Sequence, residues 1–132
     1  MAGVVWTHGD LGYANAVFRD EQLVGLIDWE FAAPADPGCD TAALLAMDAR
    51  GPRLGADDQD RRVRAVRLAF ESIVNGYEMG DTEMRRLPMG AALVLEDAVE
   101  LWLSRGVPAE DLAHLQWRAR WFREHEAILT GG

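Results

Sequence analysis

The sequence predicts an α+β fold that is mostly α-helical, with a small β-hairpin followed by about four helices. Short apolar runs separated by Gly and Asp occupy residues 4–31, and helical spacing of apolar residues begins at Pro37. The 132 residues suffice for one domain with its own core. We therefore expect a single domain over residues 1–132, with the hairpin in 1–35 and the helical part in 36–132.

The hairpin is predicted from two apolar runs, residues 16–19 and 23–27. They flank the polar residues 20–22, which is typical of two strands joined by a three-residue connection. A further short apolar run at residues 4–6 is interpreted as one more strand.

Two helices are expected after the hairpin. Residues 40–50 are rich in Ala and Leu, and the Gly-Pro pair at 51–52 ends that segment. Residues 59–77 carry apolar side chains at spacings of three and four, with Asp57 or Asp58 available as the N-cap.

Two more helices complete the expected fold. Pro88 is placed in the first turn of a helix that runs to about Ser104 and is closed by Gly106. The last helix is expected from Pro108 to about Leu129. Because it carries two apolar stripes, it should contact neighbours on two sides.

Composition excludes several classes of function. The 22 acidic and 13 basic residues give a net charge of −9, which disfavours binding to nucleic acid or to an anionic membrane. No stretch approaches the length of a membrane span, and no export signal is evident, so we expect a cytoplasmic protein. The single cysteine, Cys39, excludes an internal disulfide and is interpreted as a small buried residue.

Polar residues that could carry chemistry surround the hairpin. Asp10 precedes Asn15 by five residues in a Gly-containing loop, and Asp28 follows the second hairpin strand. The hairpin carries the chain away and back, so Asp28 should lie beside that loop. Taken singly, such residues are usually turn formers. Together they match the template of a phosphoryl-transfer loop, in which one carboxylate orients a hydroxyl while an amide oxygen and a second carboxylate hold Mg²⁺.

Three separated blocks also occur in a recognisable order. They are His-Gly-Asp at 8–10 with Asn15, Ile-Asp-Trp-Glu-Phe-Ala at 27–32, and Asp-Pro at 36–37 followed by Asp-Thr-Ala at 40–42. This set resembles the bacterial phosphotransferase family that includes aminoglycoside phosphotransferases and choline kinases. The resemblance implies a protein-kinase-like fold, of which this chain would be the C-terminal lobe.

The resemblance also implies a role for each site residue. Asp10 would be the catalytic base, and Asn15 and Asp28 would be the Mg²⁺ ligands. His8 and Asp40 would support the catalytic loop without touching substrate. The implied cofactors are Mg²⁺ and ATP or GTP, and the implied acceptor is a hydroxyl of a small molecule. No residue is assigned to binding the nucleotide.

The family's nucleotide lobe is expected to be absent. In that family an N-terminal lobe supplies a Lys for the nucleotide phosphates, whereas all 13 basic residues here are Arg and no Gly-x-Gly-x-x-Gly loop occurs. The chain alone is therefore expected to be inactive. Three explanations stay open: a fragment or truncated gene product, a subunit completed by another polypeptide, and a non-catalytic, degenerate kinase-like module for binding or immunity.

Association is expected for the isolated chain, because without the N-terminal lobe an apolar surface and a strand edge would stay uncovered. The partner would be a polypeptide that supplies the N-terminal lobe, or a second copy in a homodimer. The homodimer would join the strands at residues 4–6 or the stripe formed by Trp117 and Trp121.

Three further sets of residues have both a functional and a structural interpretation, and we favour the structural one for each. The first set could stack on a ligand but is expected in the core: Trp102, Trp117 and Trp121. The second could clamp phosphate but is expected on a solvated helix face: Arg61, Arg62, Arg64 and Arg67. The third could attract a cationic acceptor but is expected to serve solubility: Asp36, Glu96, Glu100, Glu110 and Asp111.

Overall fold

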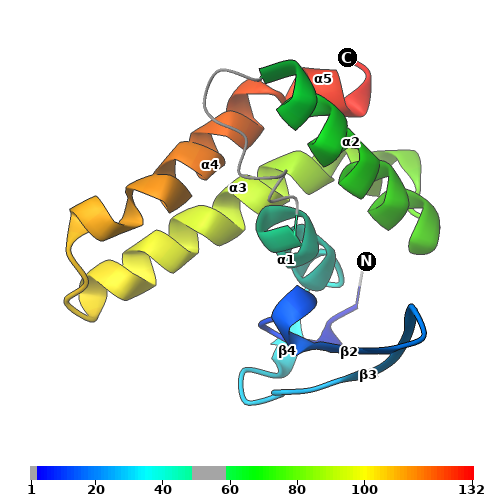
Figure 1. The fold of residues 1–132 in the computed structure, drawn as a ribbon, viewed down its shortest axis with the longest axis horizontal. Coiled ribbons are helices and arrows are strands. Elements are labelled where there is room, and N and C mark those ends of the chain that lie inside the picture. The colour runs from blue at the N-terminus through cyan, green and yellow to red at the C-terminus, as the bar shows by residue number, and fades with distance from the viewer. Residues whose placement is uncertain (1–2, 49–58) are drawn as a thin grey trace.

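The computed structural model describes residues 3–48 and 59–132, with a small β part at one end and a larger helical part (Figure 1). The strands are β1 (Val5–Thr7), β2 (Ala16–Arg19), β3 (Gln22–Leu26) and β4 (Ala33–Ala35). The helices are α1 (Gly38–Asp48), α2 (Gln59–Gly76), α3 (Asp81–Ser104), α4 (Ala113–Glu124) and α5 (Glu126–Thr130), with 3₁₀ turns at Tyr13–Asn15 and Ala109–Leu112. The predicted α+β class with a helical majority is confirmed.

The predicted hairpin is formed by β2 and β3, which pair in antiparallel fashion. The connection is one residue shorter than expected, because Gln22 already pairs with Arg19. The two turn residues, Asp20 and Glu21, have φ values of 50° and 64°. Positive φ at both positions is typical of the two-residue turn whose twist matches that of the strands.

The expected strand at residues 4–6 is β1, and its partner is β4, which the sequence did not reveal. Trp6 lies opposite Pro34, and the Thr7 hydroxyl donates to the Ala33 carbonyl at 2.9 Å. The sequence Ala-Pro-Ala lacks the residues typical of strands, and its proline fits an edge position only.

The core lies where α3 crosses α1 and packs along α4 (Figure 1). The contact between α1 and α3 depends on small residues, since Ala46, Ala91 and Ala92 are fully buried beside Leu45 and Leu95. Small side chains let the two helix backbones approach closely, and the leucines fill the remaining space.

The start predicted for the third helix is wrong. Helix α3 begins at Asp81, so Pro88 lies inside the helix and is fully buried. The actual N-terminus of α3 has Asp81 and Glu83 in its first turn, where negative charge stabilises the helix by interacting with the positive end of its dipole. Burial of Pro88 against the core compensates for the backbone hydrogen bond that proline cannot donate.

The single long helix expected at the C-terminus is also wrong. A 3₁₀ turn, α4 and α5 take its place. Helix α4 ends at Glu124, and the ring of the next residue, His125, stacks on Trp121 with centroids 4.2 Å apart. His125 adopts φ −110° and ψ 10°, outside the helical range, which separates α4 from α5.

Burial corrects two further predictions. Of the three C-terminal tryptophans only Trp121 is buried, whereas Trp102 and Trp117 are about two-fifths exposed. The ring of Trp117 packs under the guanidinium of Arg62, at 4.2 Å. Cys39 is exposed rather than buried, because it lies in the first turn of α1, on the helix surface.

Some predictions concern residues outside the described ranges, namely the N-cap at Asp57 or Asp58 and the helix stop at residues 51–52. Within residues 3–48 and 59–132, no helix combines the length and the apolar character needed to cross a membrane.

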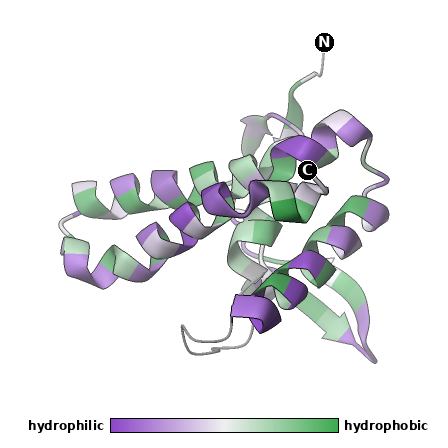
Figure 2. Ribbon diagram, turned by 90° about the horizontal axis from the view of Figure 1, so that it is seen from above, coloured by the Kyte–Doolittle hydropathy of each residue, from purple (hydrophilic) through white to green (hydrophobic). Residues whose placement is uncertain are grey.

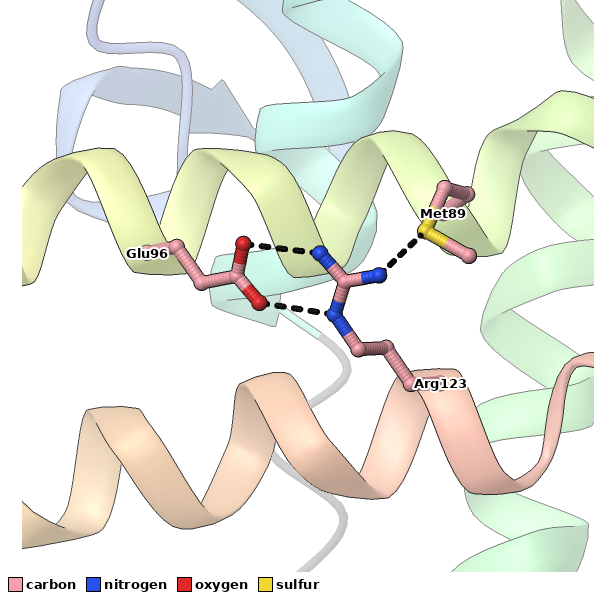
Figure 3. Close-up of polar contacts among 3 residues, drawn as sticks. All are labelled: Met89, Glu96 and Arg123. Atoms are coloured by element: carbon pink, nitrogen blue, oxygen red, sulfur yellow. Dashed lines mark hydrogen bonds and ion pairs between the residues drawn. The ribbon is translucent and has the colours of Figure 1, made fainter.

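An exposed clamp joins α3 to α4 (Figure 3). The guanidinium of Arg123 donates to both carboxylate oxygens of Glu96, at 2.7 and 2.8 Å, and to the sulfur of Met89 at 3.0 Å. The hydrogen bonds from Arg123 lower the pKa of Glu96. Glu96 therefore has a partner within the fold, Arg123 of α4.

Candidate functional site

The loop between β1 and the first 3₁₀ turn is attached to the start of α1 through Asp40. Its carboxylate accepts hydrogen bonds from the backbone N–H groups of His8, at 2.8 Å, and Gly9, at 3.2 Å. Because Asp40 lies in the first turn of α1, this contact fixes the loop to the helical core. Asp40 therefore connects the backbone of this loop to α1.

The imidazole of His8 joins the same loop to the end of β3. The ring is 2 % exposed, and its Nε2 lies 2.8 Å from the Ile27 carbonyl oxygen. Its Nδ1 accepts a hydrogen bond from the Asp10 N–H at 3.2 Å. A carbonyl oxygen can only accept, so Nε2 carries the proton that it donates to Ile27. One buried ring therefore holds Asp10 in a fixed relation to the strand that precedes Asp28.

Gly9 allows a close approach that no other residue would permit. Its φ is +83°, and a Cβ at this position would lie 2.2 Å from the Phe31 carbonyl oxygen. The backbone of the loop consequently packs directly against the segment that follows Asp28.

Asn15 lies against Asp10. Its side-chain Nδ2 donates to the backbone oxygen of Asp10 at 2.9 Å and to the Asp10 carboxylate at 3.2 Å. The Asp10 side chain is exposed. Because Nδ2 faces Asp10, the amide oxygen of Asn15 is the atom that remains for another ligand.

Asp28 is held next to Asn15 by the main chain. The N–H of Ile27 donates to the Asn15 carbonyl at 2.9 Å, so the end of β3 is fastened to the loop one residue before Asp28. Asp28 has φ 60° and is exposed. A left-handed backbone is uncommon outside glycine, although Asp adopts it more readily than most residues. The structure thus brings Asp10, Asn15 and the backbone of Asp28 to one place.

The side-chain oxygens of Asn15 and Asp28 suit a Mg²⁺ ion that is bound together with phosphates. No group of three or more His, Cys, Asp or Glu residues in the described part of the chain could hold a metal ion alone. One amide oxygen from Asn15 and one carboxylate from Asp28 are hard ligands. Mg²⁺ commonly takes one or two such protein ligands and completes its shell with water and substrate phosphates.

Two aromatic residues near the site were given no role in the site by the sequence analysis. The Trp29 ring lies 4.6 Å from the His8 ring, and its indole N–H donates to the Leu26 carbonyl at 3.0 Å. Tyr77, just beyond α2, has its pKa raised by burial and by the negative charge of Asp40. The position of Trp29 directly after Asp28 was a usable signal, whereas nothing in the sequence connects Tyr77 with Asp40.

Comparison with known proteins gives one match. The model of the Phosphotransferase enzyme family matches residues 2–78, which is more than half of the chain and includes every residue of the candidate site. No curated protein and no solved structure shows significant similarity to this chain.

Proposed function

Because this chain belongs to the phosphotransferase enzyme family, we propose that residues 8–40 form the catalytic loop and metal-binding half of a small-molecule kinase. Such a kinase would transfer the γ-phosphoryl group of ATP or GTP to a hydroxyl group. The fold proposed for the chain is the C-terminal lobe of a protein-kinase-like enzyme. The observation that carries the proposal is the hydrogen-bonded unit of His8, Asp40 and Ile27, which holds Asp10 beside Asn15 and near Asp28.

In this proposal Asp10 acts on the acceptor. Its exposed carboxylate accepts a hydrogen bond from the acceptor hydroxyl and takes the proton as the oxygen attacks the γ-phosphorus. The bond from the γ-phosphorus to the bridging oxygen breaks, and the nucleoside diphosphate leaves. The Asn15 amide, which donates to Asp10, orients the carboxylate for this step.

Asn15 and Asp28 are the residues that would hold Mg²⁺. The ion, when bound, would neutralise charge on the phosphates. His8 and Asp40 are positioning residues, since their hydrogen bonds join the backbone of the loop and of Ile27.

The contacts to the nucleotide must involve groups other than a lysine of this sequence, which contains none. We propose that an N-terminal lobe, from a longer form of the chain or from a partner polypeptide, supplies them. The same absence favours a second candidate function, a non-catalytic module that keeps the fold without binding metal and phosphate.

Manganese broadening of amide NMR signals separates the two candidates, with Mn²⁺ and pyrophosphate as the probe. The first proposal predicts that broadening centres on residues 10–15 and 28–30. Asp28→Asn should weaken Mn²⁺ binding about tenfold, equivalent to the loss of roughly 1.4 kcal/mol. Asn tolerates the left-handed backbone at this position, so the loop should stay intact.

Asp20→Asn is the matched control. Asp20 is also exposed, also has positive φ, and lies in the same hairpin, so the substitution removes the same charge at a distance from the site. Equal weakening by both substitutions would indicate a general charge effect and would overturn the ligand assignment. Absence of broadening around residues 10–15 and 28–30 would favour the non-catalytic module.

A further inference from the structure

The imidazole of His8 uses both of its ring nitrogens within the protein, and it uses them in opposite ways. Nε2 donates a hydrogen bond to the Ile27 carbonyl oxygen, at 2.8 Å, whereas Nδ1 accepts one from the N–H of Asp10, at 3.2 Å. Nδ1 can accept only while it carries no proton. The hydrogen bond that holds the backbone of Asp10 therefore requires a neutral ring.

A proton on Nδ1 would break this hydrogen bond. The ring would then turn an N–H towards the N–H of Asp10, and two donors cannot form a hydrogen bond with each other. The ring is only 2 % exposed, so water has little access to the new N–H. The side chain of Asp10 is exposed, and its backbone is free to move away from the ring on that side.

The other attachments of the loop do not depend on the charge of the ring. The Asp40 carboxylate accepts the backbone N–H groups of His8 and Gly9, and both bonds stay available when the ring is protonated. The Ile27 carbonyl accepts Nε2–H in either charge state. Protonation thus removes the attachment of Asp10 alone and leaves the start of the loop fixed to α1.

The groups that surround His8 supply negative charge. The loop, the segment after β3 and the first turn of α1 carry four carboxylates: Asp10, Asp28, Glu30 and Asp40. The phenol of Tyr77, beyond α2, has its pKa raised by burial and by Asp40, so it is uncharged near neutral pH. The hairpin strands are coloured mainly as hydrophobic in Figure 2, and their charged residues lie at the tip, residues 19–21, away from Ile27. Negative charge close to the ring is what a proton on a buried imidazole needs.

We propose that His8 is a pH-sensitive switch for the loop, which holds the backbone of Asp10 when the ring is neutral and releases it when the ring is protonated. The switch regulates the proposed catalytic base, and this consequence rests on the proposed function. The change in hydrogen bonding does not rest on it, because it involves only the chain itself.

NMR of the purified chain, without metal or nucleotide, tests the switch between about pH 8 and pH 5, where histidine side chains change charge. The ring ¹⁵N signals of His8 report its protonation. As the ring gains its proton, exchange of the Asp10 amide, corrected for the direct effect of pH, should accelerate about three- to tenfold, because one neutral hydrogen bond is lost. Exchange at His8 and Gly9 should stay unchanged, because Asp40 still accepts their N–H groups.

Substitutions assign the response to His8. The chain has two other histidines, His114 in α4 and His125 directly after it. The double variant His114→Gln, His125→Gln leaves one imidazole and should keep the response of Asp10. His8→Asn should abolish the response, because its side-chain oxygen can accept the Asp10 N–H and takes up no proton in this range. Circular dichroism checks the fold of each variant, and the double variant carries the assignment if His8→Asn does not fold.

Three results would overturn the proposal. They are a His8 ring that stays neutral down to pH 5, an Asp10 amide that does not respond while the ring gains its proton, and equal acceleration at His8, Gly9 and Asp10, which would indicate general opening of the loop. Each is distinct from a failure of the proposed function. Absence of Mn²⁺ broadening at residues 10–15 and 28–30 would count against the phosphotransferase site and leave the switch intact.

Discussion

Asp40→Ala removes the carboxylate that attaches the loop at His8 and Gly9 to α1. The lost hydrogen bond to the His8 N–H involves a charged acceptor and a buried residue, so it should cost about 2 kcal/mol. The bond to the Gly9 N–H should cost less than ~1 kcal/mol, because Gly9 is exposed and water can replace the acceptor. The total of about 2–3 kcal/mol corresponds to a decrease in Tm of roughly 10 °C for a domain of this size.

Urea unfolding measures the free energy of unfolding, and amide hydrogen exchange locates the change. Exchange at His8 should accelerate in Asp40→Ala, because its N–H loses its acceptor. Asp97→Ala removes an exposed carboxylate from the middle of α3 and should change stability by less than ~0.5 kcal/mol. Equal stability of the two variants, with unchanged exchange at His8, would refute the bracing role of Asp40.

Three further predictions concern the loop, the helical clamp and the chemistry. Gly9→Ala should lower the free energy of unfolding in urea by about 3 kcal/mol or more, because the added Cβ would clash with the Phe31 carbonyl at a positive φ. Gly25→Ala is the control. A Cβ there has no neighbour within 4 Å, so its free energy of unfolding should stay within ~1 kcal/mol of the wild type. The pKa of Glu96 is lower in the folded state than in the unfolded chain, so its contribution to stability is present above the unfolded pKa of about 4.3 and is lost as the pH falls through the folded pKa. Wild type should therefore exceed Glu96→Gln in Tm at neutral pH by a small margin that shrinks as the pH falls below the unfolded pKa, and a margin that grows on acidification would contradict the assignment. The chain alone should consume no ATP, whichever hydroxyl acceptor is supplied. ATP turnover that disappears in Asp10→Asn would show that an arginine has replaced the missing lysine and would contradict the expected inactivity.

The hairpin and the family were predictable because their signals are local. Two apolar runs on either side of Asp20 and Glu21 predict a hairpin from local sequence alone, and His8, Asp10 and Asn15 lie within eight consecutive residues. The convergence of Asp28 on that loop followed from the hairpin connection alone. The catalytic and metal-binding roles of these residues stay predictions.

The errors arose where tertiary contacts override local preference. Pro88 is a good start signal for a helix, but its burial in the core lets α3 continue through it. No glycine or proline in the sequence marks the break at His125, where the imidazole ring stacks on Trp121. Strand β4 exists because β1 pairs with it, and its own sequence carries no strand signal.

A crystal structure of the chain with Mg²⁺ and pyrophosphate would show whether Asn15 and Asp28 bind the ion. We expect one ion with the Asn15 amide oxygen and the Asp28 carboxylate among its ligands, at about 2.0–2.1 Å, and Asp10 facing the phosphate without coordinating the ion. An ion bound by other residues would contradict this expectation. So would a structure without an ion at this site, at a Mg²⁺ concentration well above the one at which the chain binds the ion in solution.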